Sequence, residues 1–70
     1  MMPLSYATAG EESIIKSIGG KPDVRQHLET LGFVVGGAVT VVSAINGNLI
    51  VNVKDTRIAV DKSLANKIMI

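Results

Sequence analysis

The sequence predicts a mainly β fold, a small SH3-like barrel of about five strands with one short α-helix inserted after the first strand. The chain has 70 residues, so residues 1–70 are expected to form a single domain. β-branched residues recur through positions 39–60, in runs separated by tight-turn signals. Helical periodicity with matching end signals occurs only at positions 23–31. These observations indicate short strands around one core, with a single helix packed against it.

The first strand is expected at positions 12–18, which are rich in isoleucine. Side chains of an extended chain alternate between its two faces. Ile14 and Ile18 therefore point to one face and Ile15 to the other, so the pattern allows either face to be the buried one. Gly19-Gly20 then ends the strand.

One amphipathic helix is expected at positions 23–31. Val24, Leu28 and Leu31 recur at i, i+4 and i+7, and they form a single apolar stripe. A helix this short is not stable alone in water. It is therefore expected to be held in place by the packing of its stripe against the sheet.

Both ends of this helix have residues of the types that helix caps require. Asp23 is predicted as the N-cap, and Gln26 follows it at the spacing of a capping box. Gly32 occupies the C′ position, where the backbone turns left-handed. Phe33 follows at C″ and can cover Leu28, as in a Schellman motif.

The second half of the chain has the pattern of a β-meander. Positions 39–45 are β-branched and lead into Asn46-Gly47, a strong signal for a two-residue hairpin turn. The chain then returns along positions 48–54, where apolar and polar residues alternate. Asp55-Thr56 is predicted to make a second tight turn before a third strand at positions 57–60.

The C-terminal residues are expected to close the barrel. Positions 61–65 are predicted to form one helical turn capped by Asp61, followed by a last short strand at 67–70. No neighbour is predicted for the outer edge of that strand, so the edge is open to pairing with another chain. An OB-fold carries its helix later, between its third and fourth strands. The early helix and the meander therefore favour the SH3-like arrangement.

Composition excludes several classes of function. The chain has no cysteine, so it forms no disulfide, thiolate metal site or cysteine nucleophile. Its net charge of +1 and its two aromatic residues, Tyr6 and Phe33, argue against a nucleic-acid binder. No apolar run is long enough to cross a bilayer, and the N-terminus lacks the features of a signal peptide. A soluble, cytoplasmic protein is expected.

A series of short segments runs through the chain in a recognisable order. It consists of Leu28-Glu29-Thr30-Leu31-Gly32, a turn ending at Gly36, and Ile58-Ala59-Val60 before an apolar last strand. This series resembles the FeoA family, the small cytoplasmic proteins of bacterial ferrous iron transport, over residues 4–70. The same fold occurs as the C-terminal domain of DtxR-type iron-dependent repressors. The resemblance thus implies an SH3-like domain as well.

Three positions depart from the family's pattern. His27 stands where Arg is common, Val35 where Pro is common, and Val60 where Leu is common. The exchanges at Val35 and Val60 are mild. The exchange at His27 matters if the family's Arg contacts a partner.

The resemblance also implies a function. It indicates a non-enzymatic accessory or regulatory protein that contacts FeoB, a membrane permease with a cytoplasmic GTP-binding domain. The chain would then lie at the inner face of the membrane only through that partner. No cofactor is required, and a divalent transition metal such as Fe²⁺ would bind transiently. The alternative is a metal-responsive module that binds a divalent ion directly.

The predicted partner contact centres on the loop after the helix. Phe33, Val34 and Val35 are large apolar residues between glycines, and not all of them can face inward. Arg25, Gln26 and Glu29 on the outer face of the helix are predicted to form a polar rim around them. The other interpretation is that Phe33 covers the helix end and Val35 closes the barrel mouth.

Metal-ligating and catalytic arrangements are sparse. His27 is expected either to pack partly against the barrel or to bind a metal with Glu29 and Asp23, supplemented by Glu11-Glu12. Neighbouring carboxylates such as Glu11 and Glu12 point apart, so they form no acid–base pair. The glycines before the helix lack the residues of a phosphate-binding loop. No catalytic residue is assigned, and the chain is not expected to be an enzyme.

Overall fold

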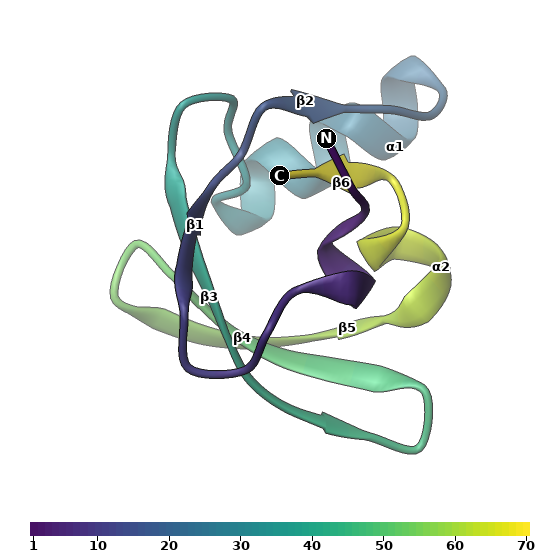
Figure 1. The fold of residues 1–70 in the computed structure, drawn as a ribbon. Helices are drawn as coiled ribbons and strands as arrows, with labels where there is room; N and C mark the ends of the chain where they lie inside the picture. The colour runs from purple at the N-terminus through teal and green to yellow at the C-terminus, as the bar shows by residue number, and fades with distance from the viewer.

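The computed structural model describes residues 1–70 and contains six strands in two sheets, one helix of ten residues and two shorter helical segments (Figure 1). In chain order the elements are η1 (Leu4–Tyr6), β1 (Glu12–Ile14), β2 (Ser17–Ile18), α1 (Pro22–Leu31), β3 (Ala38–Ile45), β4 (Asn48–Val53), β5 (Thr56–Asp61), α2 (Lys62–Ala65) and β6 (Ile68–Met69). The fold is mainly β and of the predicted SH3-like class, but its strands form two separate sheets and do not close into one barrel. The single-domain expectation for residues 1–70 stays a prediction.

Four antiparallel strands form the larger sheet, in the order β1-β3-β4-β5. The sheet curls around the core, and Val39, Val41, Val51 and Val53 all point from it into the interior. The core contains thirteen buried residues, all apolar: Leu4, Ile15, Leu28, Phe33, Val39, Val41, Leu49, Val51, Val53, Val60, Ala65, Ile68 and Ile70. Aliphatic side chains thus supply the core, with Phe33 as its one aromatic residue.

The smaller sheet joins β2 to β6 beside the two chain ends (Figure 1). Met2 and Ile70 exchange two backbone hydrogen bonds, of 3.0 and 2.9 Å. Pro3 also bridges to Met69. β6 therefore has a neighbour on each side, and the predicted open edge at 67–70 is wrong. The residues that cover it carry no strand pattern of their own.

The strand predicted at 12–18 is two strands, β1 and β2, which belong to different sheets. The chain changes sheet between them. The Ile15 N–H donates to the Gly37 carbonyl at 2.9 Å, whereas the Lys16 N–H donates to the Met69 carbonyl at 2.7 Å. Because the partners of consecutive residues lie in different sheets, the strand ends here. The fold has six strands for this reason, rather than about five.

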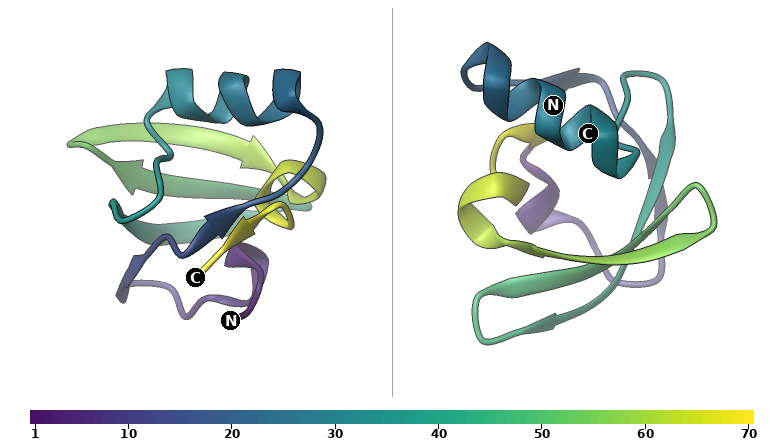
Figure 2. Two further views of the ribbon diagram at one scale, coloured as in Figure 1. Left: turned by 90° about the horizontal axis from the view of Figure 1, so that it is seen from above. Right: turned by 180° about the vertical axis from the view of Figure 1, so that it is seen from behind.

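Helix α1 lies across the open end of the curled sheet, as both views of Figure 2 show. Leu28 is fully buried, and Val24 and Leu31 pack partly against the same core. The predicted apolar stripe is thus confirmed. None of the helices has the length and apolar character needed to cross a membrane.

The start of α1 differs from the prediction. Its N-cap is Lys21, which makes no side-chain capping bond, and Pro22 occupies the first helical position. Proline suits that position because its fixed φ is helical and its missing N–H has no helical partner to lose. Asp23 therefore lies inside the first turn, where a negative charge interacts favourably with the helix dipole. The predicted N-cap at Asp23 and its capping box with Gln26 are wrong.

Candidate functional site

The end of α1 sets the direction in which the chain leaves the helix. Gly32 has a left-handed backbone with φ of 111°. Its N–H donates to the Glu29 carbonyl at 2.9 Å, and the Phe33 N–H donates to the Leu28 carbonyl at 3.0 Å. The second of these is the six-to-one bond of a Schellman motif. The predicted cap is confirmed, and the following loop starts from a fixed point.

Phe33 is completely buried in the core and is not a contact residue. The prediction that it forms part of a partner-binding patch is wrong. The Schellman geometry directs the C″ side chain back over the last turn of the helix, where Leu28 is also fully buried. The alternative interpretation, in which Phe33 covers the helix end, is confirmed.

A tight turn follows Phe33 and presents Val35 at its tip. The Gly37 N–H donates to the Val34 carbonyl at 2.9 Å, and Gly36 has φ of 88°, as the third residue of a type II turn does. The second position of this turn favours proline, and Val35 occupies it. Val35 thus occupies a position whose backbone also accepts proline, so the exchange between the two residues is mild.

The position of this turn is fixed by Ile15, the residue that follows β1. The Gly36 N–H donates to the Ile15 carbonyl at 2.8 Å, and the Ile15 N–H donates to the Gly37 carbonyl at 2.9 Å. The Val35 side chain remains 64% exposed, so it does not close a barrel mouth. The turn therefore presents an exposed apolar side chain on a backbone that is held by hydrogen bonds within the turn and to Ile15.

Three polar residues predicted as a rim are exposed on α1. Arg25 and Glu29 lie four residues apart and share one face of the helix, with Gln26 beside them. The Thr30 hydroxyl donates to the Gln26 carbonyl at 3.0 Å, so it interacts with the helix rather than with a partner side chain. The structure thus leaves this face of α1 free of intramolecular covering. A partner role for it stays a prediction.

The three candidate metal ligands do not converge. Asp23 and His27 lie four residues apart and share one flank of α1, whereas Glu29, two residues beyond His27, projects from the opposite flank. No group of three His, Cys, Asp or Glu side chains is placed to hold a metal ion. His27 is exposed, so the expectation that it packs partly against the barrel is wrong.

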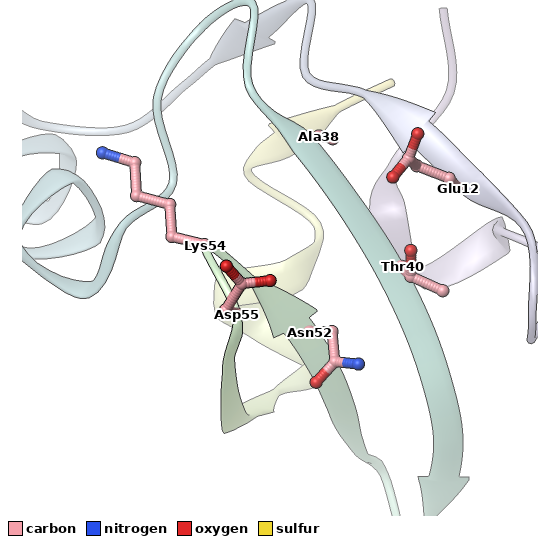
Figure 3. A pocket seen from close by; sticks show the side chains of 6 residues that line it. All are labelled: Glu12, Ala38, Thr40, Asn52, Lys54 and Asp55. Atoms are coloured by element: carbon pink, nitrogen blue, oxygen red, sulfur yellow. The ribbon is translucent and has the colours of Figure 1, made fainter.

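A hollow of about 420 Å³, which we call the sheet hollow, lies on the outer face of the larger sheet (Figure 3). Its lining residues are Glu12, Ala38, Thr40, Asn52, Lys54 and Asp55. Glu12 pairs with Thr40, and Thr40 pairs with Asn52, so these three side chains form one row across β1, β3 and β4. The amino group of Lys54 extends away from Glu12 in Figure 3. The hollow therefore offers mainly hydrogen-bonding oxygens.

The sheet hollow adjoins the Val35 turn. Ala38 lines the hollow and follows the turn directly, and it pairs with Ile14, which is 51% exposed. On the other side, the Lys54 stem lies 3.7 Å from the place a Cβ would occupy on Gly32. We use the name loop–helix surface for the predicted rim together with the exposed residues of the turn and of β1: Ile14, Arg25, Gln26, Glu29, Val34, Val35 and Ala38. Ile14 and the hollow were missed, although alternation in 48–54 already marked Asn52 as outward-facing.

The turn at the edge of the sheet hollow has an unusual backbone. Lys54 and Asp55 have φ of 50° and 62°, in the left-handed region that non-glycine residues rarely adopt. The predicted turn at Asp55-Thr56 is therefore shifted by one residue, and β4 ends at Val53 rather than at Lys54. The two residues of a two-residue hairpin turn both need positive φ, so the φ values identify Lys54 and Asp55 as the turn residues.

Comparison with known proteins places the whole chain in one family. The model of the FeoA domain matches residues 2–70. A protein of Methanocaldococcus jannaschii named "Putative Fe(2+) transport protein A" is 37% identical over 70 residues, which are 100% of this chain and 85% of the relative.

Solved structures agree with the sequence match. A crystal structure of an iron uptake regulatory protein (FeoA) has a TM-score of 0.89 at 32% identity, covering 97% of this chain and 90% of that one. Stenotrophomonas maltophilia FeoA complexed with zinc, called a procaryotic SH3 domain protein, has a TM-score of 0.84 at 27% identity, covering 99% and 88%. A manganese-dependent transcriptional repressor shares the fold, with a TM-score of 0.85 at 14% identity over 94% of this chain and 38% of that one.

Proposed function

The chain belongs to the FeoA family, and on that premise we propose that it is a non-enzymatic, cytoplasmic accessory protein of ferrous iron uptake. It acts by contact with a FeoB-type GTP-dependent iron permease, and it lies at the membrane only through that partner. The observation that carries the proposal is the Val35 turn, which holds an exposed apolar side chain on a rigid backbone beside the polar face of α1.

This arrangement has the features of a small docking site. Val35 and Ile14 supply apolar area at its centre, and Arg25 and Glu29 supply a polar rim. A turn that is already ordered loses little conformational entropy on binding. GTP turnover and ion passage belong to the partner in this proposal. The chain changes the partner's activity only by binding one of its conformations more tightly than another.

The test is an ¹⁵N NMR titration of the chain with the soluble GTP-binding domain of its cognate permease, repeated with the whole permease in a nanodisc. We expect resonances of Arg25, Val34 and Val35 to shift. Val35→Asp and Arg25→Glu should each weaken binding at least about fivefold, the range of interface residues that matter. Neither substitution should unfold the chain, because both side chains are exposed.

Matched controls lie far from this surface. Met2→Asp places the same charge on a residue that is 42% exposed beside the C-terminal strand, and Arg57→Glu reverses a charge on β5. Both should leave the affinity unchanged. The proposal fails if neither form of the permease shifts any resonance, or if the controls weaken binding as much as the loop–helix variants do.

A direct metal contact is the second candidate, because Asp23 and His27 share one exposed flank of α1. We propose no resident cofactor, and a divalent ion such as Fe²⁺ would bind here transiently with water or partner groups as further ligands. Two side chains fall short of the three or four that durable transition-metal sites use. Shifts of the His27 ring under anaerobic Fe²⁺, reduced by Asp23→Asn and unchanged by Glu29→Gln, would support this site. Unmoved His27 resonances would exclude it.

A further inference from the structure

The inner face of the larger sheet extends beyond the core at the end of β3. Val39 and Val41 are 1% and 3% exposed on this face. The register shifts at Val42, and the next inward position is therefore Ala44, which pairs with Leu49. Ala44 is exposed, although Leu49 beside it is buried. A large side chain is missing from the interior row at this position.

The missing side chain leaves a hollow of about 180 Å³, which we call the hairpin hollow. Its lining residues are Ser5, Ala44, Gly47, Asn48, Leu49 and Lys62. Ala44 and Leu49 come from the β3–β4 hairpin, Ser5 from η1 and Lys62 from α2. Residues from η1, from the β3–β4 hairpin and from α2 therefore border one open hollow with an apolar floor and a polar margin.

The walls of the hairpin hollow are fixed without a ligand. The Ser5 hydroxyl donates to the Asn66 side-chain oxygen and so joins η1 to the end of α2. Asp61 caps the start of α2 by accepting from the Leu64 N–H at 2.8 Å and from the Ser63 hydroxyl at 2.9 Å. A space with such walls is preformed, so filling it requires little reordering of the chain.

We infer that the hairpin hollow receives one aliphatic side chain from an acidic segment of a protein partner. Its size suits a single side chain, since sites for whole small molecules measure about 300–1,000 Å³. Its floor is apolar, so an aliphatic group completes the interior row beyond Val41. Lys62 is its one ionisable lining residue, and a carboxylate next to the aliphatic residue is the complementary charge.

This site is independent of the proposed docking surface. The Val35 turn precedes the first residue of β3, whereas Ala44 and Gly47 lie at its last residues and beyond. Along an extended strand these ends are separated by about 3.3 Å per residue. The hairpin hollow is thus a second contact point, and it stands or falls without the first.

The test is an ¹⁵N NMR titration of the whole chain with three capped dipeptides. N-acetyl-Leu-Glu-amide should bind, with shifts confined to residues that line the hairpin hollow. N-acetyl-Leu-Gln-amide lacks the carboxylate and should bind about threefold more weakly, the range of an exposed ion pair. N-acetyl-Ser-Glu-amide lacks the aliphatic side chain and should not bind.

Variants of the chain test the apolar floor of the hairpin hollow and the charge of Lys62 separately. Ala44→Leu fills the hollow and should abolish binding of N-acetyl-Leu-Glu-amide, whereas Ala59→Leu, the same change on the outer face of β5, should not. Lys62→Gln should remove the preference for Glu over Gln, and Lys54→Gln should keep it. Equal binding of the Leu and Ser peptides, shifts scattered over the surface, or a preference for Glu that survives Lys62→Gln would overturn the inference. The peptide comparison needs no variant, so it decides even if Ala44→Leu does not fold.

Discussion

The two turns that bound β4 have the same backbone conformation but very different residues. Asn46-Gly47 has φ of 50° and 81°, and Lys54-Asp55 has φ of 50° and 62°. Asn and Gly adopt left-handed conformations more readily than other residues do. Lysine has no such preference, and aspartate has less of one than glycine. The chain therefore satisfies local preference at one end of the hairpin and opposes it at the other.

The difference between the two turns indicates where side chains are retained for contacts rather than for backbone stability. Lys54 and Asp55 both line the sheet hollow, and the Lys54 stem covers the glycine that ends α1. Gly47 lies at the margin of the hairpin hollow, where its backbone alone forms the wall. Strain of this kind persists where the surrounding structure over-determines it, and it tends to occur at functional sites. The strained turn, Lys54-Asp55, is therefore the one next to the end of α1, and we call this part of the molecule the loop–helix end.

The largest expected effect is the difference in stability between a buried and an exposed residue of the loop–helix end, Phe33 and Val35. Phe33→Ala removes a fully buried aromatic ring and should lower the free energy of unfolding by about 3–5 kcal/mol. Val35→Ala should change it by less than about 0.5 kcal/mol, because Val35 is 64% exposed. Urea unfolding followed by circular dichroism measures both. Similar losses in the two variants would mean that Val35 is structural and not a docking residue.

A smaller effect tests whether the two ends differ in their glycines. Gly36 and Gly47 have φ of 88° and 81°, and an added Cβ would meet nothing within 4 Å at either position. Gly36→Ala and Gly47→Ala should therefore each cost about 1–2 kcal/mol, from backbone conformation alone. Thermal unfolding of the two variants side by side gives the values. A much larger cost at Gly36 would show that its hydrogen bonding to Ile15, in addition to its backbone φ, holds that turn.

Exchanging the two turns tests the contrast itself. Replacing Lys54-Asp55 by Asn-Gly should stabilise the fold by about 1 kcal/mol, because the strain is relieved. Replacing Asn46-Gly47 by Lys-Asp should destabilise it by a similar amount. If permease binding decreases in the first variant while stability rises, the strained residues serve the contact. No gain in stability would mean that surrounding contacts already compensate the strain.

Features fixed by neighbouring residues could be predicted from the sequence. The stripe on α1, the Gly32 cap and the Asn46-Gly47 turn all depend on residues within one or two turns of each other, and all are present. The cap at Asp23 was mispredicted for a local reason as well. A proline at the first helical position outweighs a good capping side chain one residue later.

Features fixed by distant residues could not be predicted. The change of sheet at Ile15 depends on Gly37 and Met69, which lie far along the chain. Phe33 fits a capping residue and an exposed apolar residue equally well by type, and only the packed core decides between them. Both hollows combine residues from at least three elements, so no single segment carries their signal.

The smallest expected effect is a change of stability with pH, and it arises at Asp61, at the junction of β5 and α2. The Leu64 N–H, and after it the Ser63 hydroxyl, lower the pKa of Asp61 below its usual value of 3.8. A carboxylate whose folded pKa is depressed stabilises the fold above its unfolded pKa, and this contribution is lost as pH falls through the folded value. Stability should therefore decrease below about pH 4, with the α2 end of β5 loosening first.

Asp61→Asn keeps an acceptor for the Leu64 N–H but cannot titrate, so its stability should vary less with pH in this acid range. Ser63→Ala removes only the second donor and should shift the transition less. Amide hydrogen exchange of Leu64 and Ala65 between pH 5 and 3 measures the local effect. The group is fully exposed, so global unfolding should respond only slightly. If the Lys54-Asp55 turn opens first on acidification instead, protonation of Asp61 is not the cause of the loss of stability at low pH.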